Sequence, residues 1–500
     1  MKWVSLLFVF SLTLHSVVSA QITVYDINKK INGSSEPHHL TVFDGKLCLL
    51  GNDVIHNEEL WSIDTLTAEK LVADVNLINN NTTWVSGCII FSQHMAVAFV
   101  ENLNKDALFY LFNNGVNGYE LYRYDGISSP VLIKEFVPGL AGVYTDCMSN
   151  MVAAKKHVYF NEPYKGVWKY NVNSGIASLI PNSNFIIDSR VRRFIVFKDK
   201  VYVNKNNSSG PDKLYVYDEV ADSFVLALNI NRFQYGRVIG DKLYFIAGNI
   251  LYQYDGINPP VTIAAAEMEV NTNSVEREFI GSYKGRIYFQ GPNNDLYEYH
   301  PVLKKTKIIA TSTLSGPYKP AGFIEYRDKL YFSAYDSLHG RELWEWDGTN
   351  PPQMTIDLLT GVTPTSPIAN GCPENFHVIG DGLYFIATSF ETPTVGCEVH
   401  RYIPTLANVQ KLSFKGEVKV YPNPATNNAT LEISLPSAQA LTVDVYSADG
   451  RKVYEVPGAI YSTGTSWVMM PVHDLPTGSY FYHVRNKENT TVVSGKLIKQ

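Results

Sequence analysis

The sequence predicts an all-β protein with one large and one small domain, and three observations carry this prediction. The 500-residue chain contains 13% aromatic residues together with 34 Gly and 25 Pro, which suits many short strands joined by tight turns. An aromatic strand motif recurs through most of the chain, and helical periodicity is absent. The length exceeds that of one ordinary domain, and the aromatic motif stops well before the C-terminus.

Composition and charge exclude several classes of protein. The chain has 42 Lys and Arg against 48 Asp and Glu, a net charge of −6, and 45% hydrophobic residues. Disordered chains have few apolar residues and high net charge, so most of this chain is expected to bury a core. A basic surface typical of nucleic-acid binders is missing, and we expect no nucleic-acid partner.

Residues 1–20 are expected to be a signal peptide. Lys2 provides a positive charge, Val4–Leu14 is apolar, and small residues lead to a cleavage point between Ala20 and Gln21. The alternative is an N-terminal membrane anchor, but this stretch falls short of the roughly 20 apolar residues that span a bilayer. Elsewhere we expect no transmembrane segment.

A strand motif of apolar and aromatic residues recurs about every 48 residues between residues 40 and 415. Eight copies are present: Leu60-Trp61-Ser62-Ile63, Leu121-Tyr122-Arg123-Tyr124, Val167-Trp168-Lys169-Tyr170, Leu214-Tyr215-Val216-Tyr217, Leu251-Tyr252-Gln253-Tyr254, Leu296-Tyr297-Glu298-Tyr299, Leu343-Trp344-Glu345-Trp346 and Val399-His400-Arg401-Tyr402. A second strand such as Leu330-Tyr331-Phe332 precedes each copy, and several copies end in an Asp-Gly hairpin turn such as Asp255-Gly256.

Counting the apolar stretches before and after these two strands gives four strands per unit. Antiparallel four-stranded units of this length are the signature of a β-propeller. We therefore predict a propeller over residues 21–415, with eight blades favoured and seven as the alternative if the unit with an insertion at 102–117 is irregular. A row of β-sandwiches is the competing architecture, but nothing resembles a linker between units.

The best copies, at Gly340–Thr349 and Gly118–Gly126, resemble the Gly-x-Glu-Leu-Trp-x-x-Asp-Gly-Thr repeats of bacterial surface propellers. The resemblance covers about 370 residues. Several units lack the glutamate or the Asp-Gly turn. The function of that family is poorly defined, so the resemblance implies a fold rather than an activity.

Residues 416–500 follow a different pattern of alternating strands, an Asp-Gly turn and a Pro-x-Gly turn, which predicts a small β-sandwich. The segment resembles the C-terminal sorting domain of proteins exported by the type IX secretion system of Bacteroidota. The matching residues are Tyr421, Pro422, Asn423, Pro424, Asp449, Gly450, Gly478, Tyr480, Lys496 and Lys499.

This resemblance implies passage through the periplasm and recognition by outer-membrane secretion machinery through residues 416–500. It also implies a protein that ends outside the cell or on its surface, either released or attached to lipopolysaccharide after loss of the sorting domain. The alternative is a generic fibronectin-like module, which does not explain the basic and apolar C-terminus, Lys496–Gln500.

Five cysteines lie beyond the expected signal peptide, where disulfides can persist. No Cys-x-x-Cys motif is present, so zinc and redox sites have no supporting spacing. Cys372 and Cys397 form the closest pair in sequence and flank one expected hairpin. They are the candidate disulfide, with two buried thiols as the alternative.

No catalytic motif occurs in the sequence, and we expect no cofactor and no metal site. The adjacent His38 and His39 are expected in a polar loop. Four glutamates, Glu59, Glu120, Glu342 and Glu398, recur at one repeat position, which indicates a structural role such as accepting backbone N–H groups. The repeated Trp and Tyr residues are expected to pack between blades. Better ligand candidates are the single loop aromatics Trp84, Tyr235 and Tyr318.

Two function classes remain open on this evidence. The favoured one is a secreted or surface binding protein with a glycan or protein ligand on one propeller face. The alternative is a secreted carbohydrate-active hydrolase or lyase that uses a few acids and bases from different blades.

Overall fold

The computed structural model describes residues 21–30, 33–64, 69–75, 95–114, 116, 119–136, 151–162, 165–184, 194–207, 210–230, 232–267, 278–311, 317–358, 371–389, 395–404, 417–447, 452–486 and 491–500. The chain divides into two compact units, one formed by Ala20–Pro404 and the other containing Thr405–Gln500. The expected domain boundary between residues 415 and 416 lies just outside these described ranges. Across them the structure is built from strands and short 3₁₀ turns, and none of their helices is long and apolar enough to cross a membrane.

The first unit contains eight four-stranded antiparallel sheets in the part of the chain that the structure describes. Each sheet is one blade. Blade 1 holds β2 (His38–Phe43), β3 (Lys46–Asn52), β4 (Glu58–Ile63) and β5 (Glu69–Ala73); blade 2 holds β6 (Met95–Val100), β7 (Lys105–Asn113), β8 (Tyr119–Tyr124) and β9 (Val131–Lys134), with the 3₁₀ turn η2 (Glu101–Leu103); blade 3 holds β10 (Met151–Ala154), β11 (His157–Glu162), β12 (Gly166–Asn171) and β13 (Ala177–Leu179); blade 4 holds β14 (Ile195–Phe197), β15 (Lys200–Asn207), β16 (Gly210–Asp218) and β17 (Ser223–Leu228).

The remaining blades follow in chain order. Blade 5 holds β18 (Phe233–Ile239), β19 (Lys242–Ala247), β20 (Ile250–Tyr254) and β21 (Val261–Ala265); blade 6 holds β22 (Ile280–Tyr283), β23 (Arg286–Gln290), β24 (Leu296–His300) and β25 (Lys305–Ala310), with η4 (Pro292–Asn294); blade 7 holds β26 (Tyr318–Tyr326), β27 (Lys329–Asp336), β28 (Gly340–Trp346) and β29 (Gln353–Ile356); blade 8 holds β30 (Glu374–Ile379), β31 (Gly382–Ser389) and β32 (Val395–Ile403).

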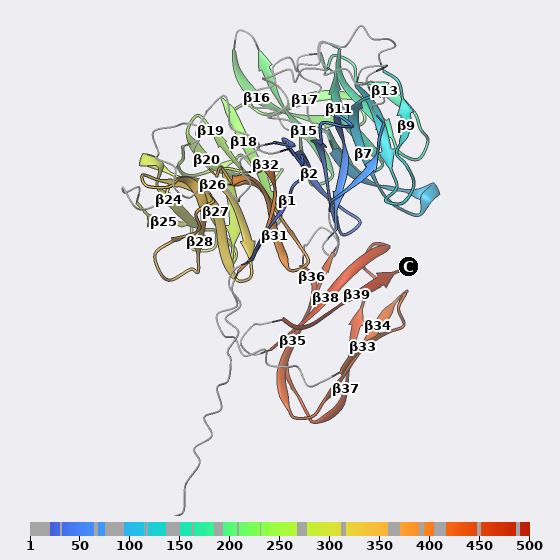
Figure 1. The fold of residues 1–500 in the computed structure, drawn as a ribbon, viewed down its shortest axis with the longest axis vertical. Helices are drawn as coiled ribbons and strands as arrows, with labels where there is room; N and C mark the ends of the chain where they lie inside the picture. Colours follow the sequence, from blue (N-terminus) through green and yellow to red (C-terminus); the bar gives the residue numbers. More distant parts are fainter. Residues whose placement is uncertain are drawn as a thin grey trace, which may run out of the picture. The chain divides into compact units, whose positions relative to one another are not determined.

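Blade 8 takes its fourth strand from the N-terminal end of the unit. Strand β1 (Gln21–Tyr25) pairs antiparallel with β32, from Gln21 opposite Ile403 to Tyr25 opposite Val399. Figure 1 shows this pairing as a blue strand beside orange ones. The first and last parts of the unit are therefore joined in one sheet, which closes the propeller.

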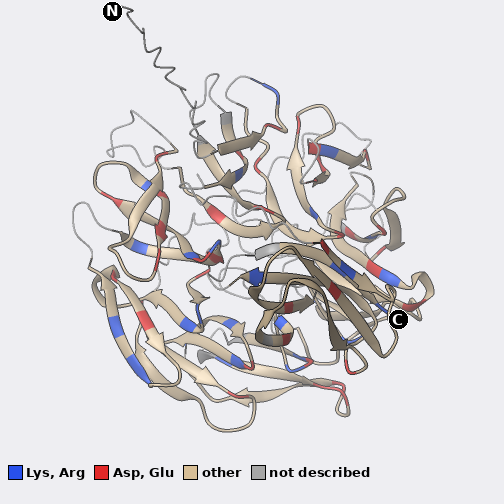
Figure 2. Cartoon of the chain, turned by 90° about the horizontal axis from the view of Figure 1, so that it is seen from below, with Lys and Arg blue, Asp and Glu red and all other residues tan. Residues whose placement is uncertain are grey.

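The first strands of the blades form the inner ring. Each contacts the first strand of the next blade, and β30 of blade 8 contacts β2 of blade 1, so the circle has no gap. Figure 2 shows the blades around this ring, with residues of both charges distributed over them. The eight-blade prediction is confirmed, and the seven-blade alternative is wrong because the unit with the insertion forms a regular blade 2.

The second strand of each blade is buried on both faces, because both sides of a blade sheet pack against neighbouring blades. In β27, the consecutive residues Leu330, Tyr331 and Phe332 are all fully buried. The fourth strands lie at the outside, where Val131 of β9 and Val261 of β21 are about half exposed. A continuous apolar run thus marks the second strand of a blade, and a partly polar run marks the fourth.

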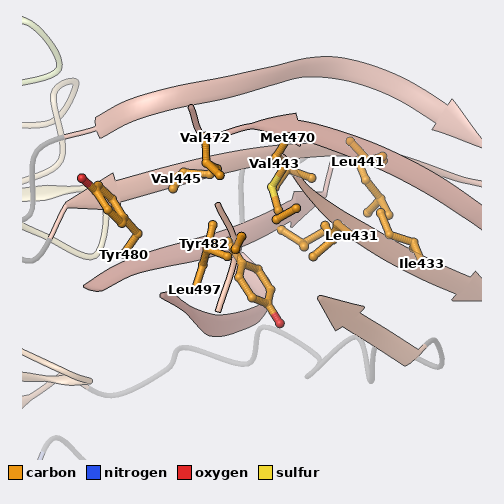
Figure 3. Close-up of a cluster of buried hydrophobic side chains, with 14 of the residues drawn as sticks. Leu431, Ile433, Leu441, Val443, Val445, Met470, Val472, Tyr480, Tyr482 and Leu497 are labelled. Carbon is orange, nitrogen blue, oxygen red and sulfur yellow. The ribbon is translucent and has the colours of Figure 1, made fainter. Parts of the chain in front are cut away.

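The second unit is a two-sheet β structure. One sheet has the order β33 (Glu417–Tyr421), β34 (Asn428–Leu435), β37 (Gly464–Pro471), and the other has the order β36 (Lys452–Tyr461), β35 (Gln439–Ser447), β38 (Gly478–Asn486), β39 (Thr491–Lys499). Residues from both sheets form one buried core, which includes Leu431, Val443, Met470 and Leu497 (Figure 3). The predicted β-sandwich is confirmed.

Candidate functional site

The four recurring glutamates are fully buried, and each carboxylate accepts backbone N–H groups. In blades 1, 2 and 7 the donor lies 16 residues further along the chain, just after the fourth strand of the same blade. Glu59 accepts from Val75 at 3.0 Å, and Glu342 accepts from Leu358 at 2.9 Å. Buried backbone groups need such partners, so the structural role predicted for these glutamates is confirmed.

Glu342 also joins its blade to the next. Its second oxygen accepts the N–H of Gly371 at 3.1 Å, which begins the approach to blade 8. A Cβ atom at Gly371 would lie 2.6 Å from that carboxylate, so only glycine leaves it room. Burial is the main cause that raises the pKa of Glu342 to about 8, against the effect of both N–H donors.

Glu398 performs the same task where the propeller closes. Because the fourth strand of blade 8 is N-terminal, its donors come from the other end of the unit: the N–H groups of Ile27 (3.3 Å), Asn28 (3.4 Å) and Ser35 (2.8 Å). The Ser35 hydroxyl donates to the same carboxylate. Burial raises the pKa of Glu398 to about 7. This carboxylate therefore holds both ends of the first unit together.

Blade 3 lacks the glutamate, and there a side chain from beyond the fourth strand accepts a backbone N–H of the third strand instead. Gly166 occupies the position of the glutamate, and the Ser183 hydroxyl accepts the N–H of Val167 at 2.8 Å. Gly166 has a φ of +126°, and a Cβ there would meet Ser183 Oγ at 2.4 Å. The glycine and the serine thus form one unit in place of a glutamate.

Buried polar side chains occur in blades 7, 8 and 1 at the end of the blades where the second and third strands join. The Arg341 guanidinium is 1% exposed, donates to the Ser333 carbonyl at 3.2 Å, and lies 4.3 Å from the centre of the Tyr335 ring. The backbone N–H of Cys372 donates to the Arg341 carbonyl at 3.0 Å, which brings the start of blade 8, with the buried Glu374, to blade 7.

The histidines of blade 1 belong to the same end. Both His38 and His39 begin strand β2 and are buried, so their expected position in a polar loop is wrong. His38 Nε2 lies 2.9 Å from Glu58 Oε1, and the two imidazole rings meet edge to face at 4.5 Å. Burial holds the pKa of His39 well below its usual range. The pairing of β2 with β3 shifts register between His38 and Thr41, and His39 has a positive φ, so this start of the strand is irregular in a way that the sequence did not reveal.

The structure does not form the candidate disulfide between Cys372 and Cys397. Both sulfurs are present as thiols, and burial is the main cause that raises the pKa of Cys397, with Glu374 a smaller one. Strand β31 lies between them, since Gly371 accepts from the Thr388 N–H and Thr388 pairs with Cys397. Two strand spacings are about 10 Å, beyond the roughly 7 Å that a disulfide bridges between Cα atoms.

The aromatic candidates have different outcomes. Tyr235 is buried against Phe279, Tyr318 is half-buried at the start of β26, and Trp84 lies outside the described residues. The repeated aromatics Trp61, Trp344 and Trp346 are buried, as predicted for packing between blades.

Within the described ranges, no group of three His, Cys, Asp or Glu side chains is arranged to hold a metal ion.

The opposite end of the blades carries a set of exposed aliphatic side chains that the sequence reading missed. They lie in the turns between the third and fourth strands of blades 2 to 6, and we call them the turn-face aliphatics: Ile127, Ile176, Val220, Ile257 and Val302. Each is between 66% and 99% exposed. Because strands alternate in direction, all third-to-fourth turns lie at one end of the propeller.

Aspartate side chains hold three of these turns in place, those that carry Ile127, Val220 and Ile257. Asp255 Oδ1 accepts the N–H groups of Ile257 at 2.8 Å and Asn258 at 2.7 Å, and Asp218 accepts from Val220 in the same way. The side-chain amide of Asn258, which donates to Asp255 Oδ2 at 2.7 Å, is the main cause that lowers the pKa of Asp255 to about 2, and the two backbone donors add to it. Gly256 follows Asp255 with a φ of +86°. The Asp-Gly step thus directs the next aliphatic residue into solvent.

In the second unit, two of the sorting motifs come together. The Asn423 side chain donates to the Lys496 carbonyl at 2.8 Å and accepts the Ile498 N–H at 2.8 Å. Ala425 forms a parallel bridge with Lys499, accepts the Gln500 N–H at 2.9 Å and donates to the Ile498 carbonyl at 2.8 Å. Residues 423–425 therefore run beside the end of β39, on the edge that β38 leaves open.

The other described motif residues lie on or next to strands β38 and β39, or around Asn423. Gly478 begins β38 opposite Lys499, and the Tyr480 hydroxyl donates to the Pro476 carbonyl at 2.7 Å. Tyr421, Pro422 and Pro424 are exposed around Asn423, Lys499 is mostly buried and Lys496 is exposed. Asp449 and Gly450 lie outside the described residues, as does Ala20 of the expected cleavage site, whereas Gln21 is the first residue of β1.

Residues 419–500 match the family model of the secretion system C-terminal sorting domain. No curated protein matches the chain. Solved structures that resemble it include a computationally designed protein (10% identity, TM-score 0.42, 74% of this chain and 98% of that one), an oligogalacturonate lyase from Vibrio parahaemolyticus (10%, 0.36, 63% and 90%), and a puromycin-hydrolyzing peptidase from Mycobacterium tuberculosis (8%, 0.43, 74% and 60%).

These TM-scores are all below 0.5, so the propeller assignment rests on the strand pairing of this chain. The sorting-domain match has a direct consequence. It marks the chain as a cargo of the type IX secretion system, exported to the cell surface or beyond, that interacts with the secretion machinery through its C-terminal domain.

Proposed function

We propose that this cargo is a surface or secreted binding protein whose propeller contacts a protein ligand through the turn-face aliphatics. The observation that carries the proposal is their regularity, since five consecutive blades each expose an aliphatic residue at one end. Single exposed aliphatic residues are ordinary, but a repeated set on one face marks an interaction surface. Aliphatic tips favour a protein ligand over a glycan, which would be expected to stack on exposed aromatic rings.

The export route belongs to the same proposal. Cleavage of a signal peptide after Ala20 would leave Gln21, the first residue of β1, as the new N-terminus. The closing strand of the propeller would remain complete, so the position of the predicted cleavage site is compatible with the fold. The producing organism is inferred to belong to the Bacteroidota, because the predicted secretion route is theirs.

Binding is tested by replacing Ile127, Val220 and Ile257 with Ser in one variant, which leaves the turn-forming aspartates in place. The matched control carries Ile55→Ser and Leu338→Ser, two exposed aliphatics in aspartate-held turns at the opposite end. Purified proteins are incubated with immobilised cell-surface proteins and with a glycan panel, and both binding and product formation are recorded.

The proposal expects binding to surface protein that falls by roughly tenfold in the triple variant and is unchanged in the control, since a few residues carry most of the binding energy of an interface. Binding that is equal in the wild type and the triple variant contradicts it. So does binding confined to glycans.

A secreted hydrolase or lyase is the second candidate, and the buried polar side chains at one end of blades 7, 8 and 1 favour it. Arg341, Glu374 and His39 offer a cation, a carboxylate and an imidazole from three blades. Product formation on the glycan panel that is lost in Glu374→Gln, with an unchanged melting temperature, would establish this candidate in place of the first.

Export is tested by fusing residues 417–500 to an unrelated folded protein with a signal peptide, in a bacterium that has the secretion machinery. The fusion should reach the surface or the medium, and the same protein without the domain should stay in the periplasm. A fusion that stays in the periplasm would indicate that the domain needs other parts of this chain for export.

A further inference from the structure

The side chain of Asn423 connects the Tyr-Pro-Asn-Pro segment to the end of the chain, although 73 and 75 residues separate the bonded positions. Its amide nitrogen bonds the Lys496 carbonyl and its amide oxygen bonds the Ile498 N–H, so the two bonds lie on either side of Leu497. The Asn423 side chain and the backbone of Ala425, which bonds the Ile498 carbonyl and the Gln500 N–H, thus take the place of a neighbouring strand for this stretch of β39.

This contact fixes the register of β39. Leu497 is fully buried in the core and Lys499 is mostly buried, whereas Lys496 and Ile498 face outward. A slip of one residue would reverse every side chain, placing Lys496 and Ile498 inward and Leu497 in solvent. Pairing with β38 alone leaves β39 as an edge strand whose final residues could slip or fray, since backbone pairing does not distinguish registers.

The outward side chains form a small apolar and basic patch. Phe481 of β38 is 42% exposed and pairs directly with Lys496, and Ile498 is 36% exposed beside it. A patch with an aromatic ring, an aliphatic side chain and an ammonium group suits a partner surface that is apolar with an acidic rim. Its composition depends on the register of β39.

We propose that Asn423 is a positioning residue for secretion: it fixes the register of β39 and thereby presents Phe481, Lys496 and Ile498 to the secretion machinery. This inference rests on the proposed sorting function of residues 417–500. Asn423 is exposed and acts through the strand it holds, so removing its side chain is expected to leave the domain folded while changing what the strand presents.

The test compares full-length Asn423→Ala and Asn423→Asp in a bacterium that has the secretion machinery. Asn423→Asp keeps the acceptor for the Ile498 N–H and loses the donor to the Lys496 carbonyl. The matched control is Asn427→Ala in the same segment, where the backbone carbonyl of Asn427 bonds the Val472 N–H. Ser434→Ala, which removes a hydroxyl contact to Thr465 at 2.9 Å in the other sheet, controls for a small loss of stability.

Export is measured as the ratio of surface and medium protein to periplasmic protein, and hydrogen exchange reports on the amides of residues 496–500. Losing two exposed hydrogen bonds should shift the balance between fixed and slipped strand by roughly tenfold. Asn423→Ala is therefore expected to lower export by about this factor and to speed exchange at Ile498, with Asn423→Asp intermediate and both controls close to the wild type.

Two results would overturn the inference. Export of Asn423→Ala equal to that of Ser434→Ala would show that register fixing has no role in recognition, while leaving the sorting function intact. Normal export of a chain that lacks residues 417–500 would remove the sorting function itself, and the role of Asn423 with it. A Lys496→Glu variant separates the role of the exposed patch from the register of β39, because it changes the patch but keeps the Asn423 contacts. This variant should be exported poorly, while the Ile498 amide exchanges at the wild-type rate.

Discussion

Buried carboxylates at Glu342 and Glu398 show how a single side chain can organise a blade. Each lies near the end of the fourth strand of its blade and accepts two or more backbone N–H groups, including at least one just after that strand. The desolvation cost is large enough to raise both pKa values above neutrality or close to it, despite the hydrogen bonds. Satisfying buried backbone groups outweighs that cost, because an unpaired buried N–H costs about 1–3 kcal/mol.

The raised pKa values make the propeller less stable as the pH rises. The pKa of Glu342 is about 8 in the folded chain against an ordinary value of 4.5, so between these values the folded state keeps a proton that the unfolded state releases. Stability conferred by this proton is fully present below about pH 4.5 and is lost as the pH passes about 8. Burial lowers the pKa of His400 to about 4, so this side chain has the opposite effect on stability. It makes the folded state less stable as the pH falls below about 6.5.

The melting temperature of the propeller is therefore expected to fall between about pH 6.5 and pH 8, and Glu342→Gln should flatten that fall. The control is Glu345→Gln, which removes a carboxylate three residues away on the same strand that pairs with Lys329. In this variant the melting temperature should change with pH as it does in the wild type. Calorimetry across this range measures the effect. A slope that is unchanged in Glu342→Gln would mean that its carboxyl titrates normally.

Ser183 offers a second test at this scale. Ser183→Ala removes the acceptor for the buried Val167 N–H and should lower the free energy of unfolding by about 1–3 kcal/mol. Ser178→Ala on the outer strand of the same blade is the comparison, with an expected change near zero. Equal denaturation midpoints for the two variants would show that another group takes over the Val167 N–H.

At the scale of elements, the terminal strand β39 has two roles. Leu497 is fully buried in the core of the C-terminal domain, and β39 pairs with β38 from Thr491 to Lys499, so the end of the chain belongs to the core of its own domain. The strand is both a structural element and the segment that resembles a secretion signal. A truncation from Lys496 would therefore remove core and signal together.

Leu497→Ala separates these roles. Deleting a fully buried leucine side chain typically costs about 2–5 kcal/mol, so the unfolding transition of the C-terminal domain should move to lower temperature. The propeller transition should stay where it is, because the two units are compact separately. Ile498→Ala, at the exposed neighbour, is the control with little expected shift. Differential scanning calorimetry of the full chain records both transitions, and a shift in the propeller transition would contradict the prediction.

At the scale of the whole molecule, the propeller is held shut by strand β1 and by Glu398. Deleting Gln21–Tyr25 removes the fourth strand of blade 8 and leaves the edge of β32 unpaired. Because each blade buries its faces only against neighbours, the loss should lower the stability of all eight blades in one transition and promote aggregation. Light scattering and thermal unfolding test this. A monomer that melts at the wild-type temperature would show that ring closure does not need β1.

The sequence by itself determined the all-β class, the repeat and the sorting domain, and it favoured eight blades over seven. Each of these depends on local patterns: alternating aromatic strands, Asp-Gly turns and a set of C-terminal motifs that can be read along one stretch of chain. The structural role of the recurring glutamates was also predictable, because an identical residue in several blades cannot serve a single site.

Only the tertiary structure decided which distant segments meet. It paired β1 with β32, placed His38 and His39 in the interior, separated Cys372 from Cys397 by a strand, and joined Asn423 to Ile498. The physical reason is the same in each case. These contacts arise from ring closure and sheet packing between residues up to 382 positions apart, as for Gln21 and Ile403, and no local pattern encodes which partner a strand edge or a buried polar group will find.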